Sequence, residues 1–211
     1  MTEQKKNTFE VAYEEAFTLG CEQLQQKDLA AWCTRAGARV RELGDARTEI
    51  LISFLHKPVR VCVPDFTFTA EDGTEIGVWE KILILHYLNQ CEGTPLSNDL
   101  INYRQVKDGA TYYPTFEKRS IKPLLKFFGS SPEKLGAAAA QLGAERAEHG
   151  DYGVRIMAFP LVPLYYVVWK GDDEFPPEAN ILFDATIEQN LSAEDIAVLC
   201  QQVVFQMVKN L

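Results

Sequence analysis

The stretch that decides the fold is VPLYYVVWKGDDEFPPEANILFD, from Val162 to Asp184. An apolar run is followed by polar and acidic residues, then by the pair Pro176-Pro177, and finally by a second apolar run. Short apolar runs bounded by turn residues are typical of buried strands. We therefore predict two strands, Leu161–Trp169 and Asn180–Phe183, that are joined by a stiff acidic corner.

The rest of the chain predicts more strands and several helices. Residue alternation predicts strands at Glu49–Leu55, Val59–Val63, Leu100–Val106 and Tyr152–Phe159. Helical spacing and capping residues predict helices at Phe9–Gln26, Leu29–Gly37, Val78–Gln90, Phe116–Phe128, Pro132–Leu142 and Ser192–Leu211. Because the strands come in runs, we expect an α+β fold with a mainly antiparallel sheet and packed helices. We expect a single domain over residues 1–211, with N-terminal helices in 1–45 and a core in 48–211.

Charge and composition limit the possible partners. The chain has 211 residues and a formal net charge of −9. Its electrostatic field opposes phosphate backbones and anionic lipid surfaces, so we expect neither nucleic acid nor membrane as a partner. The polar N-terminus predicts no secretory signal, and the longest apolar runs are too short to span a bilayer.

The five cysteines are scattered and form no CxxC pair. This spacing predicts no disulfide framework, no structural zinc and no iron–sulfur cluster. Free thiols suit a reducing compartment, so we expect a cytoplasmic protein.

His86 and Tyr87 lie in the segment VWEKILILHYLNQ, which is apolar nearly all round and predicts one of the most buried helices. An imidazole among apolar neighbours needs partners for its nitrogens. His86 is therefore a candidate axial ligand for a tetrapyrrole metal, a general base or a substrate donor, and the alternative is a hydrogen-bonded core residue. Tyr87 is a candidate cofactor-binding neighbour.

The acidic corner allows two interpretations. Asp172, Asp173, Glu174 and Asp184 offer the oxygen ligands that Mg²⁺ and Ca²⁺ prefer, which predicts a divalent metal site. Alternatively, the corner is structural, and its acids accept backbone N–H bonds. The aromatics Tyr165 and Trp169 on the preceding strand are candidates to line a pocket for a flat ligand, or belong to the core. Neither a nucleophile elbow nor a phosphate loop occurs, so the sequence leaves open whether the protein is an enzyme.

Several motifs together resemble a known family. They are LHYL, NYRQV, YYPTFEKR, HGDYGVRI, LSAED and above all the W-x-G-D-x-E-F-P-P pattern that begins at Trp169. From about Thr48 to the C-terminus, the chain is similar to a family of unknown function from mostly anaerobic bacteria and archaea. Its members are often labelled Fe–S cluster proteins, and some carry a four-cysteine iron–sulfur module that is missing here.

The resemblance implies a link to corrinoid and one-carbon chemistry, and hence a corrinoid or haem as ligand. We therefore expect a binding protein for a small-molecule or cofactor ligand, with His86, Tyr87, Tyr165 and Trp169 around it. Two alternatives remain: a metal-dependent enzyme that acts on a small polar substrate at the acidic corner, and an adaptor without a small ligand that binds a protein partner.

Overall fold

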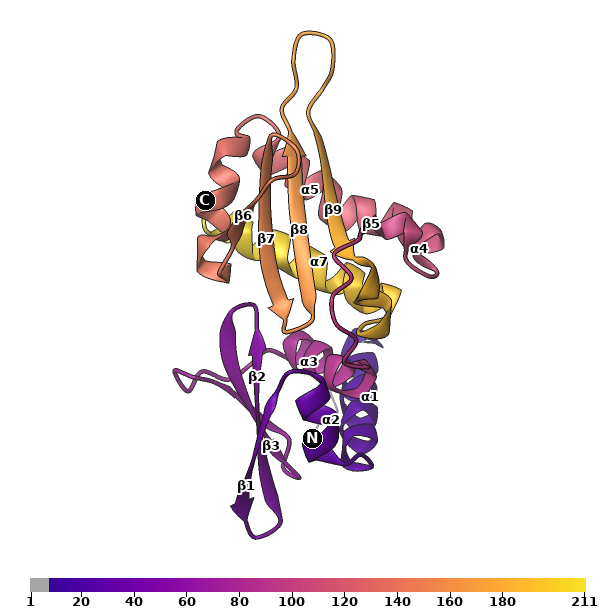
Figure 1. Cartoon of the computed structure of the whole chain (residues 1–211), viewed down its shortest axis with the longest axis vertical. Coiled ribbons are helices and arrows are strands. Elements are labelled where there is room, and N and C mark those ends of the chain that lie inside the picture. The colour runs from indigo at the N-terminus through magenta and orange to yellow at the C-terminus, as the bar shows by residue number, and fades with distance from the viewer. Residues whose placement is uncertain (1–7) are drawn as a thin grey trace, which may run out of the picture. The chain divides into compact units, whose positions relative to one another are not determined.

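The computed structural model describes residues 8–211, and their side chains from residue 11 onward (Figure 1). The chain forms two compact units. The first comprises the described residues up to Ile52 together with residues 58–92, and the second comprises residues 53–57 and 93–211. Helices and antiparallel sheets make up the structure, so the α+β class is confirmed. The single domain over residues 1–211 stays a prediction.

The first unit combines helices with an antiparallel sheet of strand order β1-β2-β3-β4. Its elements are α1 (Thr8–Gln25), α2 (Leu29–Arg35), β1 (Arg39–Gly44), β2 (Arg47–Phe54), β3 (Lys57–Val63), β4 (Thr67–Ala70) and α3 (Val78–Gln90). The expected start of the first helix at Phe9 falls within α1, but the Phe9 side chain lies outside the described side chains.

Capping and turn residues explain several of these boundaries. The Asp28 carboxylate accepts a hydrogen bond from the Ala31 N–H at 3.1 Å and so caps α2. Beyond β4 the chain turns at Asp72-Gly73, where Gly73 adopts a φ of +81° that other residues rarely adopt. Most of α3 is buried, as the sequence predicted.

The second unit contains a five-stranded antiparallel sheet of order β5-β9-β8-β7-β6. Its strands are β5 (Leu100–Asn102), β6 (Glu145–Ala147), β7 (Tyr152–Phe159), β8 (Val162–Trp169) and β9 (Glu178–Asp184). Its main helices are α4 (Gly109–Phe116), α5 (Lys122–Phe128), α6 (Leu135–Ala139) and α7 (Ala193–Lys209), and a π-helical turn at Glu117–Ile121 joins α4 to α5.

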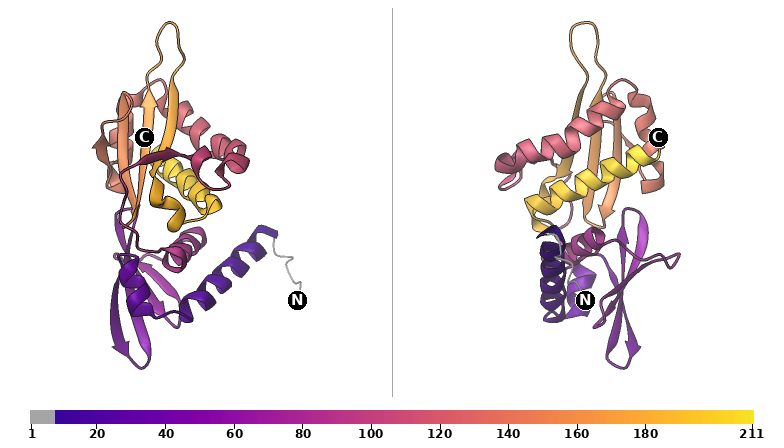
Figure 2. Two further views of the ribbon diagram at one scale, coloured as in Figure 1. Left: turned by 45° about the vertical axis from the view of Figure 1, so that its right-hand side comes forward. Right: turned by 180° about the vertical axis from the view of Figure 1, so that it is seen from behind.

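Helices cover only one face of this sheet. Seen from behind in Figure 2, α5 and α7 cross the strands, whereas Figure 1 shows the strands from the side without helices. The covered face carries buried side chains such as Ile156, Leu164, Tyr166 and Phe183. The Tyr166 hydroxyl donates to the Cys200 carbonyl of α7 at 3.3 Å, which joins the sheet to this helix. The core of the second unit therefore lies between the sheet and these helices.

Three features differ from the prediction. The expected strands do not form one sheet, because β1 to β4 pair among themselves and β5 to β9 form another sheet. In addition, the strand expected at Leu100–Val106 stops at Asn102, since the Asn102 side chain accepts the Arg104 N–H and starts a 3-10 turn. The helix expected at Phe116–Phe128 begins earlier, at Gly109.

Within residues 8–211, no helix combines the length and the apolar character that a membrane span requires.

Candidate functional site

The face of the five-stranded sheet opposite the helices carries a continuous row of side chains. Strand pairing places Glu145 opposite Arg155, Arg155 opposite Tyr165, Tyr165 opposite Leu182, and Leu182 opposite Asn102. Directly paired residues point to the same face of a sheet, so these five side chains form one line across all five strands. We call this line the open-face row.

The open-face row remains accessible although it crosses the middle of the sheet. Arg155, Tyr165, Leu182 and Asn102 are half-buried, and Glu145 is exposed. By contrast, Tyr166, the neighbour of Tyr165 along β8, points to the helices and is fully buried. The row therefore presents a cation, an aromatic ring and an aliphatic side chain next to one another on a surface that the helices of this unit leave uncovered.

The loop between β6 and β7 forms a wall on this face. Its Gly150 comes so close to Val167 that an added Cβ would lie 2.4 Å from the Val167 Cγ1 atom. In the same loop, the His149 ring meets the Tyr165 ring edge-on, with the ring centroids 5.8 Å apart. His149 is exposed, so its imidazole is available beside the aromatic ring of the row. A loop residue therefore lies next to Tyr165.

An ion pair fixes one end of the row. The Arg155 Nη2 atom donates to the Glu145 Oε2 atom at 2.6 Å. The hydrogen bond to Glu145 raises the pKa of the Arg155 guanidinium, which outweighs the opposing effect of burial, and Tyr165 contributes in the same direction. The guanidinium, which is always a cation in proteins, thus lies in the row between Glu145 and Tyr165.

A cavity of about 280 Å³ opens at this end of the sheet, between α6 and the strands β6 and β7. Its lining includes three acidic side chains, Glu133, Glu145 and Asp151, together with Arg146. Glu145 also belongs to the open-face row, so the cavity and the row adjoin. An acidic lining of this kind accepts hydrogen bonds from amide and amine groups and disfavours carboxylates.

The two predicted aromatic residues lie on β8, on the face of the open-face row. Tyr165 is in the row itself, and Trp169 stands four residue pairs further along the strand, opposite Glu178, with 39% of its surface exposed. Their spacing of four residues places both on the same face of the strand. The structure therefore brings Tyr165 and Trp169 together with His149 and Arg155 on one surface.

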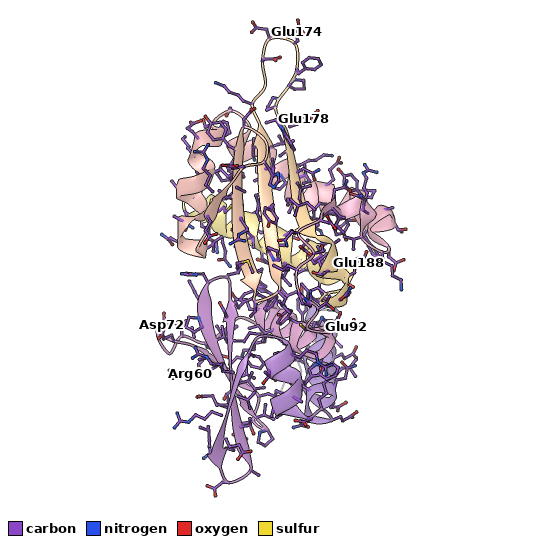
Figure 3. All side chains as sticks on the ribbon, viewed as in Figure 1. Arg60, Asp72, Glu92, Glu174, Glu178 and Glu188 are labelled. Atoms are coloured by element: carbon purple, nitrogen blue, oxygen red, sulfur yellow. The ribbon has the colours of Figure 1, made fainter. Side chains whose placement is uncertain are left out.

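The acidic corner forms the loop between β8 and β9, which projects beyond the sheet with Glu174 near its tip and Glu178 at its base (Figure 3). Asp172 stabilises this loop, since its Oδ1 atom accepts the N–H groups of Glu174 at 2.9 Å and Phe175 at 2.8 Å. These backbone hydrogen bonds lower the pKa of Asp172. Asp172 is thus a loop-forming residue.

Asp184 lies at the opposite end of β9 and is 2% exposed. Its carboxylate accepts hydrogen bonds from the backbone N–H groups of Ser97, Asn98 and Thr186 and from the hydroxyls of Ser97 and Thr186. Burial alone would raise the pKa of Asp184, but these hydrogen bonds outweigh it and lower the pKa. Asp184 therefore serves to hold the segment before β5 against the end of β9.

The four acidic candidates for a divalent metal are consequently not gathered in one place, because Asp184 and the Asp172–Glu174 corner occupy opposite ends of a strand. Across the described part of the chain, no group of three or more His, Cys, Asp or Glu side chains could hold a metal ion.

His86 and Tyr87 belong to α3 in the first unit. The Tyr87 side chain is fully buried, and its hydroxyl donates to the Ala36 carbonyl at 2.8 Å. This hydroxyl therefore fastens α3 to the end of α2. His86 points elsewhere on the helix and is half-buried. Nearby, Asn89 donates to the Gly20 carbonyl at 2.8 Å, so polar groups on α3 already bond to neighbouring backbone.

Sequence reasoning missed His149 and Arg155 as site residues. The segment AEHGDYG carries no motif that indicates a site, and only its position over β8 gives His149 a neighbour in the site. One signal was available, because Arg155 interrupts an otherwise apolar strand at Tyr152–Phe159. A charged residue at one position of a buried strand indicates that its face is open.

Comparisons with known proteins give a family and no further relative. Neither a curated protein nor a solved structure matches the chain. The model of one family, described as a domain of unknown function (DUF3786), matches residues 28–206, which extends from the start of α2 into α7 and includes the whole open-face row. Because this match covers most of the 211 residues, the chain belongs to the DUF3786 family.

Proposed function

We propose that the protein is a cytoplasmic binding protein for a flat cofactor of the tetrapyrrole class, and that the open-face row is the binding surface. The observation that carries this proposal is the placement of Arg155, Tyr165 and Leu182 side by side on the uncovered face of the sheet. A half-buried aromatic ring next to an aliphatic side chain offers a flat apolar surface on which a macrocycle can lie.

His149 is the residue of this surface that could bind the central metal of such a cofactor. It is exposed, and the edge-on contact with Tyr165 keeps its imidazole at the row. A neutral imidazole is a common ligand for iron and cobalt. The chain has three histidines, so His56 and His86 are the other possible ligands, and His86 on α3 is the one that the sequence favoured.

The acidic cavity beside the row favours a corrinoid over haem. Haem carries two carboxylates, which Glu133 and Asp151 would repel, while Arg146 in the same lining offsets one of these negative charges. The edge of a corrinoid carries amides, whose N–H groups can donate to these carboxylates. Arg155 and Glu145 are paired with each other, so neither leaves a free charge to attract or repel a haem carboxylate.

Visible spectra of the full chain, recorded during titration with cobalamin and separately with haem, test this proposal. We expect a saturable spectral change with cobalamin at a lower concentration than with haem. The three single variants His56→Ala, His86→Ala and His149→Ala examine every histidine of the chain. The His149→Ala variant should lose the spectrum of the histidine-bound cobalt, while His56→Ala should behave as the wild type.

The outcomes separate the alternatives. Loss of the spectrum only in His86→Ala, with the variant still folded by circular dichroism, would move the site to α3. A chain that gives no spectral change with either ligand would refute the tetrapyrrole proposal. Loss of binding in Tyr165→Ala, together with retention in the buried-face variant Tyr166→Phe, is the result expected if the open face binds the macrocycle.

A further inference from the structure

The loop between β8 and β9 carries the most exposed large apolar side chain of the described residues. Phe175 is 68% exposed, and it directly follows Glu174, which Figure 3 shows near the tip of the loop. At the base of the loop, Trp169 adds a second exposed aromatic side chain. An exposed phenyl ring gives up the stabilisation that burial would provide, and here it shares one loop with the exposed Trp169.

Hydrogen bonds and close packing order the backbone of this loop. The Asp172 N–H donates to the Phe175 carbonyl at 2.9 Å, while the Asp172 carboxylate accepts the Phe175 N–H, so the two residues close the loop from both sides. Gly171 packs so closely that an added Cβ would lie 2.7 Å from the Pro177 nitrogen. Pro176 and Pro177 further restrict the backbone. A loop ordered in this way loses little entropy when a partner binds it.

The charges around Phe175 indicate the kind of partner. Asp172, Asp173, Glu174 and Glu178 lie within three residues of Phe175 along the chain, and Lys170 is the cation of this segment. This excess of negative charge opposes anionic membranes and nucleic acid. A protein surface with Lys and Arg side chains around an apolar pocket complements both the ring and the acids.

We propose that residues 170–178 form a docking loop that inserts Phe175 into an apolar pocket of a protein partner whose rim is basic. This interaction is separate from the binding of a small ligand on the open-face row. One aromatic ring and a few acids make a small interface, which is typical of transient complexes. Such an interface depends on a central aromatic side chain more than on its total area.

Photo-crosslinking identifies the partner. The full chain with Phe175→p-benzoyl-phenylalanine is expressed in cells of its source organism, and the same amino acid at Tyr112, a 49% exposed position on α4, serves as the control. Crosslinks at position 175 that are missing at position 112 identify candidates by mass spectrometry. The site of the crosslink on the partner should lie in an apolar pocket with neighbouring Lys or Arg residues.

Affinity measurements with the purified partner then decide. Phe175→Ala should weaken binding about tenfold or more, as at other interface hot spots. Phe175→Trp should bind within a few-fold of wild type, since a ring remains. The double variant Asp173→Lys/Glu174→Lys should weaken binding at low salt, and added salt should reduce the difference because it screens the charges.

Three results would overturn the proposal. They are crosslinks at position 175 to copies of this chain or to lipid alone, an affinity that Phe175→Ala leaves unchanged, and a charge reversal that strengthens binding. Since Phe175, Asp173 and Glu174 are exposed, these variants should unfold at the same temperature as the wild type, and the thermal transition verifies that loss of binding is not loss of fold.

Discussion

Replacement of Asp184 by asparagine tests whether this buried carboxylate is structural. In the wild type, its Oδ1 atom accepts four hydrogen bonds, from the N–H and hydroxyl groups of Ser97 and of Thr186, at 2.7 to 3.1 Å. Its Oδ2 atom accepts the Asn98 N–H at 2.7 Å. In Asp184→Asn, an amide NH₂ replaces one of these oxygens and cannot accept a hydrogen bond.

The expected loss follows from these partners. An unsatisfied buried donor costs about 1–3 kcal/mol, and a hydrogen bond to a charged acceptor contributes about 1 kcal/mol more than a neutral one. We therefore expect Asp184→Asn to lower the free energy of unfolding of the second unit by about 3 kcal/mol. Urea denaturation followed by circular dichroism measures this loss. The control Asp173→Asn changes an exposed acid and should stay within about 0.5 kcal/mol of the wild type.

The pH dependence of this loss has a definite sign. Because the folded state lowers the pKa of Asp184, ionised Asp184 stabilises the fold above its unfolded pKa of about 3.9. This contribution is lost as the pH falls through the lower pKa of the folded state. The difference between wild type and Asp184→Asn should therefore be largest near neutral pH and should shrink in acid. An Asp184→Asn variant as stable as the wild type at neutral pH would refute the structural role. Stabilisation by Mg²⁺ or Ca²⁺ of the wild type alone would also refute it.

Three further predictions concern the cap of α7, the cysteines and a tight turn. Ser192→Ala should lower stability by about 1 kcal/mol in urea denaturation, because Ser192 accepts the Asp195 N–H at the start of α7, whereas Ser192→Thr should retain most of the cap. A thiol reagent should label the half-buried Cys62 first and reach Cys200 only after unfolding, because burial raises the pKa of the Cys200 thiol. Equal labelling of the two cysteines in the native protein would contradict this prediction. Gly109→Ala should destabilise the protein by about 3 kcal/mol or more in thermal unfolding, since an added Cβ would lie 1.9 Å from the Tyr103 carbonyl oxygen. A loss of stability below about 1 kcal/mol would contradict that geometry.

Local signals in the sequence predicted most element types. Asp28 and Ser192 cap helices where the sequence predicted that helices start, because capping depends on residues within one turn. The signal at Asn102 was present but overlooked: Asn102 and Gln105 form a reciprocal cap, in which the Gln105 side chain accepts the Asn102 N–H at 3.0 Å. This cap ends β5 after three residues and excludes the longer strand that was predicted.

The distribution of strands over two sheets could not be predicted in the same way. Alternating apolar residues show that a segment is a strand with a buried face, but they do not show which strand pairs with it. Val59–Val63 and Tyr152–Phe159 have similar patterns and yet belong to different sheets. Their separation follows from tight turns that pair β1 to β4 with sequence neighbours before the chain reaches α3.

The same limit applies to the candidate site. Tyr165 and Trp169 were identified from the sequence because they lie on one strand. The acidic corner was also identified from the sequence. Arg155 and His149 were missed because they approach Tyr165 through strand pairing and a loop. Asp184 was grouped with the acidic corner by its closeness in sequence, whereas a strand of seven residues separates them.

Nuclear magnetic resonance of the full chain during titration with a tetrapyrrole tests the binding surface most directly. Diamagnetic cob(III)alamin is suitable, because it leaves backbone amide signals sharp. We predict that the signals of Arg155, Tyr165 and Leu182 shift with the ligand concentration and saturate, while those of the helix-covered residues Ile156 and Tyr166 change less. Shifts confined to α3 around His86, or no shift at a ligand concentration well above that of the protein, would contradict binding on the open face of the sheet.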